Sequence, residues 1–488
     1  MEKSIKHFQD ITVEVLQKAQ IELFENPENF NEFAEAIHKG LDTLACKFIQ
    51  ETLEELDLLI KNSFKRKKSW NIEKYSCKQL ITSFGTVKFR KTLYKNKNDN
   101  SMRYLLDHAL NLDKHERITE DALVKIIEEA TETSFQKGGE SFSNLDSVTR
   151  QTVKRVVHNL EFPKTSEKKQ KKRIVKNLYI DADEDHIKLQ FHNTKGDIHR
   201  NDYGRKNNTR YVKLIYVYEG VEQENFKSKR RRLINPQYFC RACDEADNGA
   251  LWDEVYEYIC NNYEIDKIEN IYLNGDGGQW IKSFRNRVKG VTYIIDEFHL
   301  NKYIKQILSY AYDSKDEVNE KLIEIIKYGK KETFANLIDY LRNNIDQNKS
   351  IYLLDQSEAY ILKNWTACRR RLMGSDDLIG CSAEGHVSHV LSSRMSSRPL
   401  GWSKIGAAKV ARLREYKYNH KRVIDLVRYQ KYHSYIHNSR ALVYSASDIK
   451  QYQNEYNNLG KYYDNFHVHL DIKKRKALAA SNYCKRAI

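Results

Sequence analysis

The chain has few of the features that mark secreted or membrane-bound proteins. Its 488 residues include only eight cysteines, mostly isolated, which is typical of reduced thiols and argues against a disulfide framework. Cys240 and Cys243 have no second pair at zinc spacing, so a structural zinc site is not expected. No run of about 18 apolar residues occurs, and the first 20 residues lack the apolar core of a signal peptide. We therefore expect a cytoplasmic protein.

The charge balance points to a polyanionic partner. Lysine and arginine number 83 against 67 acidic residues, which leaves a surplus of 16 positive charges and a pI of about 9.1. Such a balance favours nucleic acid or an anionic membrane surface. Hydrophobic residues make up 40% of the chain, enough for globular folding, and its length predicts two to four domains.

Hydrophobic periodicity predicts a multidomain α+β protein. Helical spacing dominates the N-terminal region, which also contains a hairpin that turns near Gly85. Strands are predicted at 174–190, 211–218, 268–273 and 291–295, with a further strand after the basic stretch 227–233. The predicted regions are N-terminal helices and hairpin (1–115), helix-turn-helix (116–160), basic linker (161–173), strand-rich α/β block with a mixed sheet (174–300), all-helical stretch (301–375), a helix that carries an acidic residue (376–415) and a basic helical C-terminal region (416–488).

The segment before the linker has the pattern of a DNA-binding helix. Asp146 or Ser147 can cap a helix that runs from 148 to 158 and buries its valines. An ordinary surface helix of a bundle fits the same pattern. If this helix is the recognition helix of a helix-turn-helix, its outward side chains contact DNA; these are Thr149, Arg150, Gln151 and Lys154.

Three acidic residues far apart in the sequence have settings that suit metal-bound carboxylates. Asp183 lies in a strand, and Asp181 shares its strand parity, so either can face the site. Asp276 follows a short apolar strand between glycines, which allow close approach of a ligand. Glu384 begins a helix behind Ser382. Each acid alone also fits a solvated surface group or a helix cap.

Other polar residues lie near these acids in the sequence. Asp296 and His299 follow the strand 291–295 at a spacing that places both side chains near one face of a helix. A histidine there can contact a phosphate or position a carboxylate, and a simple helix cap explains the pair equally well. Downstream of Glu384, several serines accompany Arg394 and Arg398, which suits a DNA backbone passing a metal site.

Taken in order, these motifs resemble the ISLre-two family of bacterial insertion-sequence transposases, which are relatives of the Mutator-like DDE transposases. The resemblance rests on Tyr-Ile-Asp-Ala-Asp-Glu-Asp-His, Asn-Gly-Asp-Gly, Asp-x-x-His and Ser-Ala-Glu-Gly-His-Val, at residues 179–186, 274–277, 296–299 and 382–387. It extends to the hairpin and the helix-turn-helix, and so covers nearly the whole chain. It implies an RNase H-like catalytic domain interrupted by the all-helical stretch.

The resemblance also implies roles for single residues. Asp183, Asp276 and Glu384 would hold two Mg²⁺ or Mn²⁺ ions for cleavage and joining of DNA. Asp296 and His299 would lie beside them, and Trp365 would stack on a flipped base. The expected partner is double-stranded DNA, at the element ends and at the target, bound by a nucleoid-associated homo-oligomer without a membrane. A nuclease that only hydrolyses, or a DNA-binding regulator with a vestigial site, is the alternative.

Overall fold

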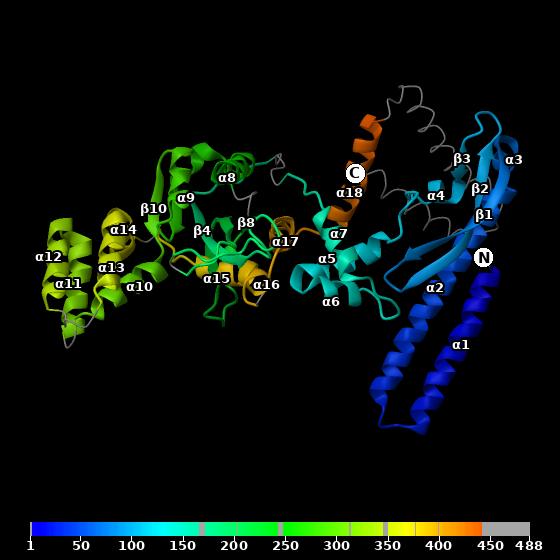
Figure 1. Cartoon of the computed structure of the whole chain (residues 1–488), viewed down its shortest axis with the longest axis horizontal. Coiled ribbons are helices and arrows are strands. Elements are labelled where there is room, and N and C mark those ends of the chain that lie inside the picture. Colours follow the sequence, from blue (N-terminus) through cyan, green and yellow to red (C-terminus); the bar gives the residue numbers. More distant parts are fainter. Residues whose placement is uncertain are drawn as a thin grey trace. The chain divides into compact units, whose positions relative to one another are not determined.

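The computed structural model describes residues 2–164, 171–202, 204–242, 247–311, 314–344, 350–375, 377–398 and 400–441. The chain divides into two compact units, residues 1–429 and 430–488 (Figure 1). Helices and strands alternate in a multidomain α+β arrangement that includes a mixed sheet. Among the described residues, no helix is long and apolar enough to span a membrane. Part of the predicted linker, residues 165–170, and the predicted tail from 442 lie outside the described residues.

The N-terminal region confirms the predicted hairpin. Strand β1 pairs antiparallel with β2, and the turn between them contains Gly85 at a φ of 151°, which favours glycine. Leu80, Val87 and Phe89 of the hairpin are buried, and Ile49 and other residues of α2 pack against their cluster. The elements are α1 (Glu2–Glu25), α2 (Phe30–Asn62), α3 (Phe64–Ser69), β1 (Trp70–Ile81), β2 (Thr86–Asn96), β3 (Met102–Tyr104) and α4 (Leu105–Ala109).

Three helices follow: α5 (Glu120–Glu132), α6 (Phe135–Glu140) and α7 (Arg150–His158). The predicted cap of the last helix was wrong. Thr149 is the cap, and its hydroxyl accepts a hydrogen bond from the Thr152 amide at 3.3 Å. Asp146 instead accepts from the Thr86 amide, so this residue ties the helical region to the hairpin.

A mixed five-stranded sheet forms the centre of the next region, in the order β10-β9-β4-β5-β8. Strands β4, β5 and β8 are antiparallel neighbours, whereas β9 and β10 run parallel to β4. All the predicted strands are confirmed, although residues 220–223 and 231–234 form a separate two-stranded ribbon. The strands are β4 (Asn177–Lys188), β5 (Thr209–Tyr218), β6 (Gly220–Gln223), β7 (Arg231–Ile234), β8 (Gln237–Ala242), β9 (Asn270–Gly275) and β10 (Val291–Ile295).

Alternating side chains give the sheet two buried faces. One face carries Tyr179, Tyr216 and Tyr238. These side chains share a hydrophobic core with helices that precede the sheet in the sequence and with helices that follow it. The helices that contribute buried residues to this face are α5, α7, α15 (Ala383–Val387), the π-helix η5 (Ser388–Ser392), α16 (Ser393–Met395), α17 (Lys404–Tyr418) and α18 (Val423–Ala441).

The other face carries Ile180 and Val217 and packs on Trp252. Its core continues without interruption into the helices between β10 and α15, through residues such as Leu322 and Ile361. The prediction of helices in this stretch is therefore confirmed for its described residues. The helices here are α8 (Asn248–Asn262), η2 (Ile265–Lys267), α9 (Gln279–Lys282), η3 (Ser283–Asn286), α10 (Glu297–Leu308), α11 (Lys315–Tyr328), α12 (Lys331–Asn343), α13 (Tyr352–Lys363) and α14 (Trp365–Met373).

Candidate active site

Strand β4 places three aspartates, Asp181, Asp183 and Asp185, on one face, because alternate residues of a strand point the same way. They have different surroundings. Asp181 is fully buried, and Asp183 is 9% exposed. Asp185 accepts hydrogen bonds from the hydroxyls of Ser392 at 3.0 Å and Ser396 at 2.6 Å. The outer two aspartates therefore hold neighbouring structure, and the middle one faces the candidate site.

The carboxylate of Asp181 is enclosed by hydrogen-bond donors. The hydroxyls of Tyr216 and Tyr218 donate to it at 2.6 and 3.2 Å, and the side-chain amide of Asn274 donates at 2.7 Å. The backbone amide of Ser382 adds a longer bond of 3.4 Å. Burial raises the pKa of Asp181, although these donors act in the opposite direction. This arrangement suits a residue that positions the segment leading to Glu384.

The carboxylate of Asp183 lies within electrostatic range of the other predicted acids. Burial raises its pKa to about 7, a hydrogen bond from the Glu184 amide opposes the rise, and the carboxylates of Asp276 and Glu384 add to it. The charge of His299 acts in the opposite direction. The structure thus brings together side chains from β4, the loop after β9, α15 and α10, so that Asp183 suits a cation-binding role better than Asp181.

The loop that carries Asp276 is held by the helical insertion. The Tyr360 hydroxyl donates to the Asp276 carbonyl oxygen at 2.6 Å. Gly277 has a φ of 99°, and a Cβ there would lie 2.9 Å from the side-chain nitrogen of Asn364. The Asp276 carboxylate accepts from the Gly278 amide at 2.8 Å. Both the backbone conformation and the close approach therefore require glycine at position 277.

Asp296 and His299 form a hydrogen-bonded pair beside these acids. Asp296 caps α10 by accepting from the Phe298 amide at 3.3 Å, and its other oxygen lies 2.8 Å from Nδ1 of His299. This bond to Asp296 raises the pKa of His299 despite burial, and the charges of Asp183 and Asp276 act in the same direction. The predicted helix cap by Asp296 is thus confirmed, and the same carboxylate contacts the partly buried His299.

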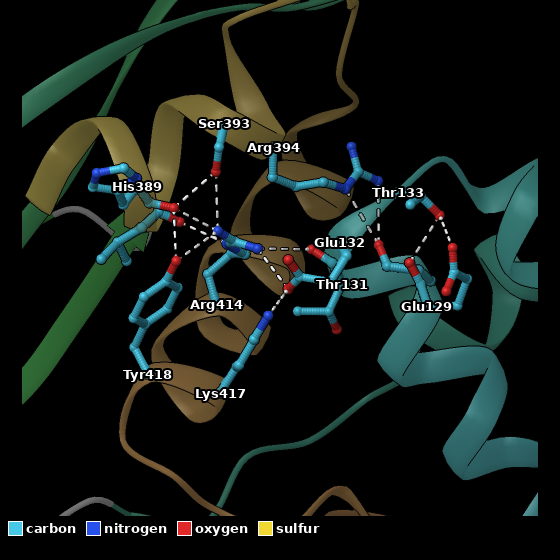
Figure 2. A network of polar contacts seen from close by, with 12 residues as sticks. Glu129, Thr131, Glu132, Thr133, His389, Ser393, Arg394, Arg414, Lys417 and Tyr418 are labelled. Carbon is cyan, nitrogen blue, oxygen red and sulfur yellow. Dashed lines mark hydrogen bonds and ion pairs between the residues drawn. The ribbon is translucent and has the colours of Figure 1, made fainter.

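Glu384 is exposed in the first turn of α15, and the segment after it is strongly anchored. Figure 2 shows Arg414, which is 2% exposed and donates to the carbonyl oxygens of His389 and Val390, both at 2.6 Å. The same guanidinium reaches Glu132 of α5 at 2.6 Å. Arg414 therefore ties the π-helix behind Glu384 to α5 and α17.

A second arginine connects the insertion to strands β9 and β10 and, through Asn274, to Asp181. Arg371 of α14 donates to the carbonyl oxygens of Ile295 at 2.9 Å and Ile379 at 3.1 Å. Its third bond, of 2.8 Å, goes to the side-chain oxygen of Asn274, the residue that donates to Asp181. One chain of hydrogen bonds thus runs from the insertion, through β9, to β4.

The donor set fits a hard cation. Asp183, Asp276 and Glu384 offer carboxylate oxygens, the ligands that Mg²⁺ prefers. Their mutual repulsion is relieved by a positive charge placed among them. Within the part of the chain that the structure describes, however, no three His, Cys, Asp or Glu side chains already have the geometry of a metal site. The Glu384 side chain is exposed.

The residues predicted to contact DNA fall into two groups. Thr149, Arg150, Gln151 and Arg398 are exposed, and Lys154 is partly exposed. Trp365 and Arg394 are buried instead. The Trp365 ring meets Phe334 edge to face at 5.6 Å. Arg394, which Figure 2 labels, donates to the Ala130 carbonyl at 3.3 Å. The positions of these two residues suit packing and anchoring.

Sequence reasoning missed the residues that hold the acids in place, namely Asp185, Asn274, Tyr360, Arg371 and Arg414. The sequence could have indicated a role for Asp185, because it lies on the same face of the strand as the other two aspartates. Arg371 and Arg414 gave none, since a buried arginine in a helix looks like a solvated one until its partners are known.

These features define a multidomain α+β protein with an acidic cluster on the central strand β4 of a mixed sheet and at the end of its neighbour β9. Residues 23–431 match the model of an uncharacterised protein family, UPF0236. The UPF0236 protein TTE2489 of Caldanaerobacter subterraneus subsp. tengcongensis is 33% identical over 391 residues, which cover 80% of this chain and 79% of that protein.

A second relative from the same organism has a name that begins UPF0236 protein TTE0033/TTE0744. It is 33% identical over 398 residues, which cover 82% of this chain and 80% of that protein. The chain belongs to the UPF0236 family.

Proposed function

We propose that this protein is a DDE transposase of a bacterial insertion sequence, similar to the ISLre-two family, with an RNase H-like catalytic domain. The observation that carries the proposal is the approach of Asp183 to Asp276 and Glu384, which come from three separate elements. The chain has a surplus of 16 positive charges, which favours a polyanionic substrate. Neighbouring carboxylates in such a chain suit metal-assisted chemistry on that substrate.

The order of elements supports the same proposal. One acid lies in β4 and the second directly follows its neighbour β9, and the third follows the helices α11 to α14, which are inserted after α10. An RNase H-like domain interrupted by a helical insertion requires this order. The insertion also supports the site physically, because Tyr360 and Arg371 bond to the residues around Asp276 and Asp181.

The names of the relatives give independent support. One joins eleven locus designations of a single strain, and another joins four. A coding sequence that multiplies within a genome is what an active insertion sequence produces. A conventional metabolic enzyme or regulator gives no reason for such repetition.

In the proposed mechanism, Asp183, Asp276 and Glu384 would hold two Mg²⁺ or Mn²⁺ ions. Such ions, when bound, would supply Lewis-acid chemistry for attack on a phosphodiester by water or by a DNA 3′-hydroxyl. Asp296 keeps the His299 ring oriented beside the acids. Asp181 and Asp185 hold the two ends of the segment that carries Glu384. The protein acts on double-stranded DNA as a homo-oligomer at the bacterial nucleoid.

A strand-transfer assay tests this proposal. The DNA is a labelled duplex that carries one end of the element, taken from the sequence flanking the gene, with Mg²⁺ or Mn²⁺ present. Joined product is expected from the parent and from the control Glu320→Gln, an exposed acid of α11. Glu384→Gln and Asp183→Asn should yield none.

The other outcomes separate the alternatives. Cleaved but never joined DNA would indicate an RNase H-like nuclease. DNA binding without any metal-dependent cleavage by the parent would indicate a regulator with a vestigial site. Unchanged activity of Glu384→Gln would overturn the assignment of the three acids.

A further inference from the structure

The strand pair that carries Asp183 extends beyond the rest of the sheet. Strands β4 and β5 stay paired as far as Lys188 and Thr209. On one side, β9 pairs with β4 only up to Asp181, and on the other side β8 first pairs with β5 at Val212. The last pairs, 186–188 with 209–211, therefore form a two-stranded arm. Backbone bonds between Lys188 and Trp402, at 2.9 Å, and between Gln190 and Trp402, also at 2.9 Å, fix its far end.

A basic cavity of about 560 Å³ lies on this arm. Its floor includes two cross-strand pairs, His186 with Tyr211 and Lys188 with Thr209. None of its described lining residues is acidic. The positively charged residues that line it are Lys188, Arg200, Arg205 and Lys206.

The wall of the cavity is preformed by backbone bonds. Arg200 and Lys206 face each other in an antiparallel bridge, and the Asn201 amide donates to the Arg205 carbonyl at 2.9 Å. The nearby carboxylate of Asp197 accepts from three backbone amides, those of residues 192, 193 and 194, so it is engaged within its own turn. The basic side chains are therefore held together without an acid among them, which favours capture of an anion.

We propose that this cavity binds the phosphodiester backbone of DNA next to the catalytic site, an inference that rests on the proposed function. His186 and Lys188 lie three and five residues beyond Asp183 on the same strand, which corresponds to about 10–17 Å at roughly 3.3 Å per residue. This length equals about three to five base-pair steps of roughly 3.4 Å. Strand alternation points both side chains away from the Asp183 face, so the cavity and the Asp183 carboxylate lie on opposite faces of the strand pair. A backbone bound in the cavity therefore approaches the acids around the edge of β4 beyond Asp181, where β9 has ended.

The cavity also offers an aromatic surface. Tyr211 is 50% exposed, and its ring meets the His186 ring edge to face at 4.8 Å. Clustered positive charge beside an open aromatic ring is the combination with which proteins bind single-stranded nucleic acid, whose bases can stack on the ring. An acidic polypeptide would use the charge but would not need the ring, so DNA is the favoured ligand.

The test is the salt dependence of DNA binding. A fluorescein-labelled duplex of about 30 base pairs is titrated with the full chain in EDTA at several salt concentrations, and anisotropy gives the affinity. The variant is Arg200→Gln/Arg205→Gln/Lys206→Gln. The control is Lys315→Gln/Lys330→Gln/Lys331→Gln, which removes the same charge from exposed positions on and beside the insertion helices.

Loss of three phosphate contacts should make the negative slope of the log association constant against log salt concentration less steep by about 2–3. The affinity near physiological salt should fall by roughly tenfold or more. The control should keep the parental slope. The variant Arg200→Lys/Arg205→Lys retains the positive charge, so it should bind DNA nearly as the parent does. That result would show that the weaker binding of the triple glutamine variant comes from lost charge and not from misfolding. A triple glutamine variant with the parental slope would overturn the inference and leave the transposase proposal intact. A parent chain that binds no DNA would overturn both.

Discussion

The side-chain amide of Asn274 donates a hydrogen bond of 2.7 Å to the buried carboxylate of Asp181. Its oxygen accepts a bond of 2.8 Å from Arg371. One neutral side chain therefore joins a buried negative charge on β4 to a positive charge on the helical insertion. This link explains how a segment nearly a hundred residues further along the chain than Asn274 can be held at the acidic cluster.

Replacement of Asn274 should destabilise the protein. In Asn274→Ala, Asp181 and Arg371 each lose a partner, and a buried charge without its partner costs about 1.5–3 kcal/mol. Urea denaturation of the full chain in EDTA measures the loss. Asn301→Ala, on an exposed position of α10, should change the free energy of unfolding by less than about 0.5 kcal/mol. Equal stability of the two variants would contradict the role assigned to Asn274.

Substitutions of Asp183 and of Asp181 should have different effects, the first on cleavage and the second on stability. Asp183→Asn removes a carboxylate from the proposed metal site, and metal-dependent cleavage should fall by more than about 10²-fold. Asp181→Asn instead disturbs a buried network of three side-chain donors, so it should lower the free energy of unfolding by about 2–3 kcal/mol. Cleavage rates with saturating Mn²⁺ and urea denaturation in EDTA measure the two effects. If Asp183→Asn lost only stability, the assignment of the two residues would be reversed.

Sequence patterns predicted the strands of the sheet, because alternation and flanking turns are local signals. They also proposed Asp183, Asp276 and Glu384 as candidate site residues, but they could not separate Asp183 from Asp181, since both share one strand parity. The separation depends on Tyr216, Tyr218 and Asn274, whose positions follow from strand order. The sequence could not predict the burial of Trp365 and Arg394 for the same reason. Their partners, Phe334 and Ala130, come from other segments, and only tertiary packing brings them into contact.

The contact between the insertion and the loop of Asp276 should matter for catalysis more than for folding. Tyr360→Phe removes the hydroxyl that donates to the Asp276 carbonyl but keeps the ring, so stability should fall by only about 1 kcal/mol. The loop then loses a positional constraint. Because small misplacements of a reacting group can cost up to roughly 10²-fold in rate, we expect kcat to fall about 10–100-fold.

Single-turnover cleavage across a range of Mn²⁺ concentrations provides the measurement. A displaced Asp276 should raise the Mn²⁺ concentration needed for half-maximal rate, which a purely structural defect would leave unchanged. Tyr340→Phe is the matched control, since that ring is 63% exposed on α12. Parental kinetics of Tyr360→Phe would show that the insertion does not position the loop.

The network around Arg414 should carry much of the stability of the segment behind Glu384 (Figure 2). In Arg414→Met, the carbonyl oxygens of His389 and Val390 lose the guanidinium as a donor and Glu132 loses its buried partner, so a loss of about 3–5 kcal/mol is expected. Lys417→Met removes a 49% exposed cation from the same carboxylate and should cost less than about 1 kcal/mol. Urea denaturation at pH 7 compares the two, and equal losses would contradict a special role for the buried arginine.

The same network predicts that the free energy of unfolding depends on pH. Burial raises the pKa of Glu132, but the hydrogen bond from Lys417 and the charge of Arg414 outweigh it, and the pKa lies below its ordinary value. A carboxyl group with a lowered pKa in the folded state stabilises the protein above its unfolded pKa, and that stabilisation is lost as the pH falls through the folded pKa. The stability difference between the parent and Arg414→Met should therefore be smaller at pH 3.5 than at pH 7. Glu132→Gln should remove this pH dependence, because the amide does not titrate; a difference that grew in acid would show that Glu132 is not the group that Arg414 stabilises.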